Sequence, residues 1–168
     1  EPYVDPVHLR QAVAAIPQWP GADIVTLVTP LVRPGTLLDD LWECLTNPNL
    51  VKVAMARGGQ ALYFSRSAIP FVRDGLETLL DGKTELPPSL PFYRHLGLYL
   101  YRRSALERFV QLPPSPLEDL EKLEQLRAME AGMRIYAVEV EGAPVAVDVP
   151  EDVALAERSA PGLSVGSP

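Results

Sequence analysis

Polar side chains that could bind a hydroxyl-rich or anionic ligand stand at several points of the sequence. In the stretch 94–101, leucines alternate with other residues. In an extended strand, a period of two puts the second set on one face: His95, Gly97, Tyr99 and Tyr101. Glycine within a strand often marks the close approach of a ligand or of another backbone. This face could therefore bind a ligand. Alternatively, His95 is a core histidine and Gly97 leaves a gap into which a helix packs.

Arg66 and Asp148 each follow a short apolar run. Arg66 stands at the end of the predicted strand 61–65, and α/β proteins bind ligands outside the carboxyl ends of strands. Its guanidinium could bind a carboxylate or phosphate, or form a surface ion pair. Asp148 ends the run 145–147, one residue too early to cap the helix predicted after Pro150. It is a candidate ligand for a divalent cation, with a surface aspartate as the alternative.

Glu124 and Gln125 lie within a helix predicted over Leu117–Ala131. The signals for its ends are an N-cap at Ser115, Pro116 at the first position, a capping box with Glu118, and Gly132 after the last turn. Helical spacing places Glu124 between Leu117 and Leu120, so we expect its carboxylate to point inward. An inward carboxylate needs a partner. That partner is either a buried arginine or, with Gln125 beside it, the hydroxyls of a polar ligand.

Composition excludes several classes of protein. The 168 residues carry 15 basic and 22 acidic side chains, for a formal charge of −7, which argues against a nucleic-acid binder that neutralises phosphates. One cysteine and two histidines nearly exclude a zinc or iron–sulfur centre, so a metal here would be a hard ion bound by oxygen. The sequence has no apolar run long enough to span a membrane and no disulfide pair, and we expect a cytoplasmic protein.

Predicted strands and helices interleave along the whole chain. The strands fall at 24–29, 51–56, 61–65, 94–102 and 135–140, and the helices at 7–16, 37–45, 70–80, 106–110, 117–131 and after Pro150. This order predicts an α/β fold with a mixed, mostly parallel sheet and helices on both faces. Because no long linker divides the chain, we expect one domain over residues 1–158 and a flexible tail over 159–168.

Seven segments in order resemble the 3-deoxy-manno-octulosonate cytidylyltransferases, also called CMP-KDO synthetases. The segments run nearly from end to end: 1–6 (EPYVDP), 47–53 (NPNLVKV), 61–70 (ALYFSRSAIP), 95–101 (HLGLYLY), 113–118 (PPSPLE), 123–127 (LEQLR) and 147–152 (VDVPED). No single segment is decisive, but seven in order are highly specific. The resemblance implies a Rossmann-like nucleotidyltransferase fold, incomplete at the amino terminus.

The resemblance also implies a reaction. A cytidylyl group passes from CTP to the anomeric hydroxyl of 3-deoxy-manno-octulosonate (KDO), with release of pyrophosphate, for lipopolysaccharide synthesis. It implies Mg²⁺, a cytoplasmic homodimer, and neither nucleic acid nor membrane as a partner. Residues matching the acid-sugar pocket are Arg66, His95, Tyr99, Glu124 and Gln125, and Asp148 matches a Mg²⁺-binding aspartate. No catalytic residue separate from these ligands is expected, since such chemistry needs mainly positioning and charge neutralisation.

The chain departs from the family pattern at its start and near its end. It begins at Glu1-Pro2, so we expect it to lack the glycine-rich segment that binds the CTP phosphates and a second metal carboxylate. Val149 stands where the family commonly has threonine. Two alternatives stay open. One is a CMP-sugar synthetase that uses a nine-carbon sialic acid, and the other is a catalytically inactive dimerisation or interaction module.

Overall fold

An open five-stranded sheet organises the computed structural model, which describes residues 5–80 and 82–142. The strands are β1 (Ile24–Pro30), β2 (Lys52–Met55), β3 (Ala61–Ser65), β4 (Tyr93–Tyr101) and β5 (Ile135–Glu139). Their order in the sheet is β3-β2-β4-β1-β5. Helices and strands alternate, so the α/β class and the mixed sheet predicted from the sequence are confirmed.

The expectation of a mostly parallel sheet is wrong for the described strands. Only β1 and β5 pair in parallel, whereas β1–β4, β2–β3 and β2–β4 are antiparallel. The chain geometry explains this difference. A short turn joins β2 to β3, which enforces an antiparallel hairpin, while the long connection that contains the helices after β4 allows β5 to return parallel to β1.

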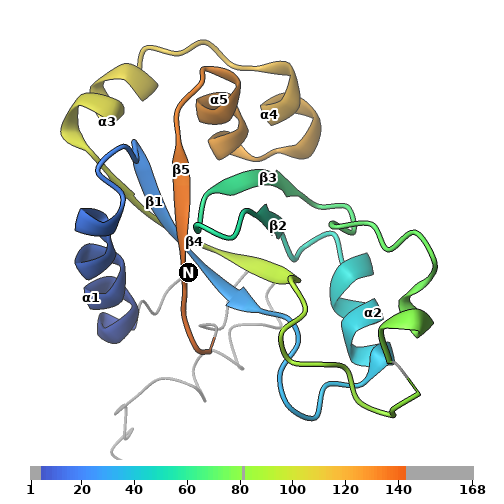
Figure 1. The fold of residues 1–168 in the computed structure, drawn as a ribbon. Coiled ribbons are helices and arrows are strands. Elements are labelled where there is room, and N and C mark those ends of the chain that lie inside the picture. The colour runs from blue at the N-terminus through green and yellow to red at the C-terminus, as the bar shows by residue number, and fades with distance from the viewer. Residues whose placement is uncertain (1–4, 81, 143–168) are drawn as a thin grey trace, which may run out of the picture.

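Helices cover both faces of the sheet, as predicted. They are α1 (Pro6–Ala15), α2 (Leu38–Thr46), α3 (Arg103–Phe109), α4 (Pro116–Glu121) and α5 (Glu124–Glu130), with short 3₁₀ turns at Ile16–Gln18 and Leu76–Leu80. In Figure 1, α3, α4 and α5 lie at the top, α1 lies at the left beside β1, and α2 stands at the right.

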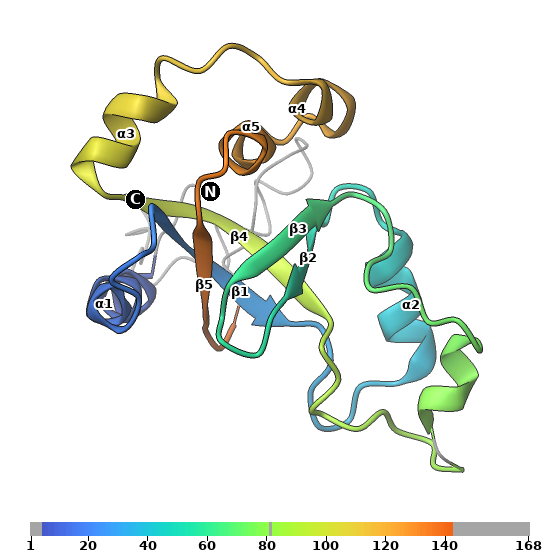
Figure 2. The same cartoon turned by 45° about the horizontal axis from the view of Figure 1, so that its top comes forward.

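Adjacent residues of β1 point to opposite faces of the sheet and belong to two different apolar clusters. Val28 belongs to the core under α3 and α5, and Leu27 packs with Ala12 of α1 on the opposite face. This alternation is the ordinary consequence of the pleat. A third cluster of apolar side chains joins α2 to the turn at Leu76–Leu80. The turned view in Figure 2 shows α2 well apart from α1 and α3.

The helix predicted over Leu117–Ala131 is in fact two helices. Its start is as expected, because the Ser115 side chain accepts from the Glu118 backbone in a capping box, and Gly132 follows the end with a φ of 74°. The helix is interrupted at Lys122, whose φ of 54° lies in the left-handed region. Continuous helical spacing therefore does not hold across this break, and the predicted face that joins Leu117, Leu120 and Glu124 does not exist.

The tip of the β2–β3 hairpin curls toward β5. The Ala137 backbone N–H donates to the Gly59 carbonyl at 2.8 Å, and the Trp19 indole donates to the Gly58 carbonyl at 3.0 Å. Trp19 also stacks on Tyr136 with ring centroids 5.0 Å apart. These contacts fix the hairpin against the β5 edge of the sheet, so that the curled sheet encloses the core under α5.

Three predictions lie outside the described residues: the helix after Pro150, the tail over 159–168 and the place of Asp148. The single domain predicted over 1–158 is likewise untested as a whole. Among the described residues, no helix is both long and apolar enough to span a membrane.

Candidate functional site

His95, Tyr99 and Tyr101 share one face of β4, as the sequence predicts. The His95 and Tyr99 rings have centroids 5.2 Å apart, and the Tyr99 and Tyr101 rings 6.2 Å. A bulge in the pairing of β4 with β1 does not disturb this arrangement. Thr26 pairs with Tyr99 and Leu27 with Leu96, so the register of the two strands shifts across Gly97 and Leu98. An insertion of two residues keeps the alternation of faces.

The imidazole of His95 is fixed by Thr26, a residue that the sequence analysis did not single out. His95 Nε2 lies 2.9 Å from Thr26 Oγ1, which lies 2.8 Å from the Leu98 carbonyl oxygen. The hydroxyl has one proton and a carbonyl only accepts, so the hydroxyl donates to Leu98 and Nε2–H donates to the hydroxyl. Burial, with a smaller contribution from the Arg94 charge, lowers the pKa of His95 from 6.5 to about 3. At neutral pH the ring is therefore neutral, with Nδ1 as an acceptor.

Glu124 and Gln125 differ in their burial. Glu124 is exposed, so its predicted inward orientation is wrong, whereas Gln125 is buried with 4% of its surface exposed. The expected salt bridge to a buried arginine is also absent among the described residues. Arg127, the arginine of α5, instead lies 3.2 Å from a carboxylate oxygen of Glu118. The break at Lys122 rotates α5 relative to α4, and this rotation decides which side chain points inward.

The first turn of α5 nevertheless lies close to the aromatic row of β4. Leu123, Leu126 and Phe64 belong to one core cluster, and Tyr99 and Tyr101 pack against that cluster. The negative charge of Glu124 raises the pKa of Tyr101, after the larger effect of burial. The structure therefore brings Glu124 and Gln125 to the same side of the sheet as the β4 phenols.

The buried amide of Gln125 is unusual. Its Nε2 has no hydrogen-bond partner among the described residues. A buried N–H donor without an acceptor costs about 1–3 kcal/mol, and native proteins seldom carry such a group without a reason.

Arg66 makes contacts that the sequence analysis did not predict. Its guanidinium is bound to main-chain carbonyls at the end of β3: Nε donates to Glu121 O at 2.8 Å and Nη1 to Pro48 O at 2.7 Å. The predicted surface ion pair is not found among the described ion pairs. Glu121, which ends α4, stands three residues before Glu124, and the α4–α5 junction thus connects Arg66 with the β4 group.

No metal centre is present in the described part of the chain. Residues 5–80 and 82–142 contain no group of three or more His, Cys, Asp or Glu side chains that could hold an ion. The metal ligand expected from the sequence, Asp148, lies outside the described residues.

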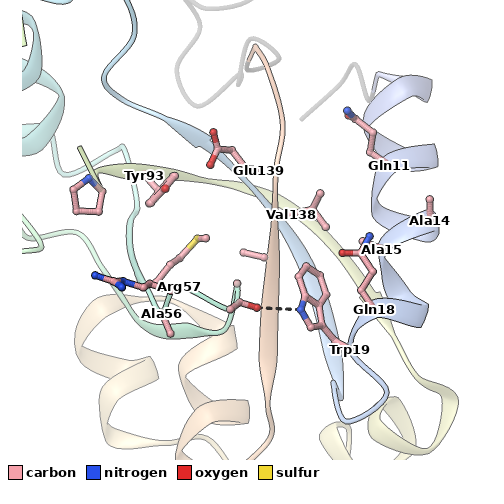
Figure 3. A pocket seen from close by; sticks show the side chains of 15 residues that line it. Gln11, Ala14, Ala15, Gln18, Trp19, Ala56, Arg57, Tyr93, Val138 and Glu139 are labelled. Carbon is pink, nitrogen blue, oxygen red and sulfur yellow. Dashed lines mark hydrogen bonds between the residues drawn. The ribbon is translucent and has the colours of Figure 1, made fainter. Parts of the chain in front are cut away.

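A hollow of about 740 Å³ opens between α1, the hairpin tip and β5, away from these candidates. Figure 3 shows Trp19 and Gln18 on one side of it, and Arg57 and Tyr93 on the other. Its lining contains none of the residues predicted for the acid-sugar pocket.

Comparison with solved structures defines the class of protein. A structure titled as CMP:2-keto-3-deoxy-manno-octonic acid synthetase complexed with CTP superposes with a TM-score of 0.72 and 31% sequence identity. It covers 94% of this chain and 59% of that chain. The described fold is thus that of a nucleotidyltransferase, as the sequence predicted.

Sequence comparison narrows the class to a family. The family described as "Cytidylyltransferase" matches residues 1–135. The 3-deoxy-manno-octulosonate cytidylyltransferase of Syntrophotalea carbinolica is 44% identical over 163 residues, which cover 97% of this chain and 61% of the relative. That of Rhodopseudomonas palustris is 47% identical over 148 residues, covering 84% and 54%. The chain belongs to the cytidylyltransferase family, and it spans little more than half the length of these relatives.

Proposed function

We propose that this chain is the acid-sugar-binding part of a 3-deoxy-manno-octulosonate cytidylyltransferase. The observation that carries the proposal is the position of Glu124 and Gln125, at the start of α5, on the side of the sheet that holds the β4 phenols. A hydroxyl-rich sugar is a ligand that such a group of polar side chains can bind. The relatives named above, with the same enzyme name in two distant bacteria, support the choice of sugar.

Each candidate residue has a role in this proposal. The neutral imidazole of His95 offers Nδ1 as an acceptor for a sugar hydroxyl, and Tyr99 offers its phenol. The exposed Glu124 carboxylate accepts from further hydroxyls, while Gln125 donates. Arg66 receives the carboxylate of the sugar, because its guanidinium is already held in place and forms no ion pair among the described residues.

The reaction is a cytidylyl transfer. The anomeric oxygen of KDO attacks the α-phosphorus of CTP and the bond from that phosphorus to the bridging oxygen breaks. Pyrophosphate leaves, and the hydroxyl proton passes to the surroundings. Mg²⁺, with Asp148 as one ligand, would neutralise phosphate charge. The proposal extends to a cytoplasmic homodimer that supplies lipopolysaccharide synthesis, as the family resemblance implies.

Calorimetric titration of the chain with KDO and with the sialic acid N-acetylneuraminate tests the sugar assignment. We expect KDO to bind more tightly, and Gln125→Leu to weaken KDO binding about tenfold, the effect of losing a buried hydrogen bond to a ligand. Gln125→Leu should fold at least as stably as wild type, because it removes a buried donor without an acceptor. Gln111→Leu makes the same change at an exposed glutamine and should leave KDO binding unchanged.

Other outcomes point to the alternatives. Tighter binding of N-acetylneuraminate would identify a sialic-acid synthetase. Failure of both sugars to bind, with a stable dimer in sedimentation, would favour the interaction module. Pyrophosphate release from CTP in the presence of KDO, measured on a chain extended with the amino-terminal segment of the family pattern, tests the transfer itself. We expect Asp148→Asn to lose the Mg²⁺-dependent part of that release, because an amide is a poorer ligand for a hard cation.

A further inference from the structure

The side chains that surround Arg66 at the end of β3 have no role in the function proposed above. At their centre is Lys52, whose side chain is wholly buried in the strand β2. Its Nζ donates to two main-chain carbonyls, Asn47 O at 2.8 Å and Arg66 O. No described ion pair includes Lys52. A buried ammonium without a direct carboxylate partner is costly, since the charge has lost its water.

The cost of burying this ammonium needs an explanation. Burial lowers the pKa of Lys52, and the positive charge of Arg66 lowers it further. An apolar residue in this strand position would avoid both effects. The lysine therefore does something that packing alone does not require, and what its ammonium holds is the carbonyl of Arg66.

Glu121 holds the same arginine from the opposite side. Its carboxylate accepts from the Arg66 backbone N–H at 2.9 Å and from Ser65 Oγ at 2.6 Å. Its main-chain carbonyl accepts from Arg66 Nε at 2.8 Å. Lys52 and Glu121 thus fix the peptide groups on both sides of the Arg66 Cα, and the α4 end fixes the base of the guanidinium.

The carboxylate of Glu121 is used on the backbone and not on the guanidinium. The guanidinium partners are neutral carbonyls, those of Glu121 and Pro48, which orient its plane without cancelling its charge. Nη2 makes no hydrogen bond to the described residues. The result is an oriented cation whose Nη2 is open to an acceptor such as a carboxylate oxygen.

We propose that Lys52 and Glu121 are positioning residues that orient the Arg66 guanidinium for the carboxylate of an anionic ligand. This inference rests on the proposed function for the identity of that ligand, an acid sugar. It rests on the described contacts alone for the positioning. The two parts can therefore fail separately.

The first measurement is spectroscopic and needs no ligand. Hydrogen exchange of the Arg66 Nε–Hε group is followed by NMR in the chain and in Lys52→Met, which keeps the length and fills the same space without the charge. We expect exchange to accelerate about tenfold, the size of one lost charge-assisted hydrogen bond. Lys83→Met makes the same change at an exposed lysine and should leave the rate unaltered.

Arg127 Nε–Hε serves as an internal reference, because it lies beside Glu118 and not in the Lys52 cluster. If Arg66 and Arg127 accelerate together, Lys52 only stabilises the fold and the proposal is overturned. Unchanged exchange at Arg66 in a folded Lys52→Met would overturn it too. Should that variant not fold, Glu121→Gln, which retains one acceptor oxygen, answers the same question.

The second measurement concerns the ligand. The probes are KDO and its methyl ester, which lacks the negative charge. We expect Lys52→Met to weaken KDO binding at least fivefold and to change methyl-ester binding less than twofold, since misorientation of Arg66 affects only the carboxylate contact. Equal weakening of both probes would show a general loss of structure and overturn the positioning role. Absence of any KDO effect on the Arg66 signal in wild type would instead contradict the sugar assignment, while the exchange rates would still decide the positioning.

Discussion

The neutral state of His95 should make the fold sensitive to acid in a way that one substitution removes. The pKa of His95 is lowered from 6.5 to about 3, mainly by burial against Phe64 and Tyr99. In the unfolded chain the imidazole is protonated below about pH 6.5. In the folded chain it is protonated only below about pH 3. Below pH 6.5 the unfolded state therefore binds more protons, and stability falls as the pH falls.

The magnitude follows from the difference in pKa. Between pH 7 and pH 4.5, two pH units lie inside the window from 6.5 to about 3, and each unit corresponds to about 1.4 kcal/mol. The ideal loss is thus nearly 3 kcal/mol. Because the ring is only partly buried by surface area, water softens the penalty, and we expect about 2 kcal/mol. This is a large share of the stability of an ordinary domain, about 5–15 kcal/mol.

The assay is urea unfolding at pH 7 and pH 4.5 for wild type and His95→Gln. The glutamine amide can donate to Thr26 Oγ1 as Nε2 does, and it does not titrate in this range. We expect wild type to lose about 2 kcal/mol more than the variant between the two pH values, with equal dependence on urea. The subtraction removes the contribution of carboxylates, which both proteins share. Equal losses in the two proteins, or an NMR titration of His95 with a midpoint near 6.5, would refute the reasoning.

Three further predictions concern the backbone and can be checked by thermal or urea unfolding. Gly59→Ala should destabilise the fold by about 1–3 kcal/mol, because φ is 85° and the new Cβ would lie 2.7 Å from Trp19 Cζ2. In the control Gly58→Ala, the new Cβ meets nothing within 4 Å, so this variant should be nearly neutral. Equal effects of the two substitutions would show that the hairpin tip does not pack tightly against the indole. Lys122→Gly should stabilise by up to about 1 kcal/mol by relieving a left-handed φ of 54°, and a loss of stability would contradict a break at this residue. Ser115→Ala should cost about 1 kcal/mol through loss of the capping box, and no change would mean that the cap contributes little.

Local patterns determined the elements of this protein. The strand patterns at 24–29 and 61–65 and the capping signals at Ser115 each specify a conformation through the residues themselves, and each is found where it was expected. The alternation along β4 likewise placed His95 and Tyr99 on one face, because a strand has a period of two and the bulge preserved it.

Strand direction was decided by the tertiary structure. The apolar run of β1 predicted burial, which is observed, but burial is compatible with parallel and antiparallel neighbours alike. The partner and direction of each strand depend on how the connections cross the sheet. The spacing of hydrophobic residues does not predict the course of these connections.

The orientation of Glu124 and Gln125 was also beyond the sequence. Helical spacing assumes an unbroken helix, and nothing in Lys122-Leu123 forbids one. The break coincides with the bonds from Glu121 to Ser65 and Arg66, residues more than fifty positions earlier in the chain. The interruption between α4 and α5 thus lies next to a contact between segments that are far apart in the sequence.

Lys52 shows the same division between sequence and structure. The sequence displays a lysine inside the apolar run Val51-Lys52-Val53, a signal that could have been noticed, and a buried charge always requires partners. Its partners are the carbonyls of Asn47 and Arg66, which lie on two different loops. Main-chain carbonyls are present at every residue, so only the folded arrangement of the loops selects these two.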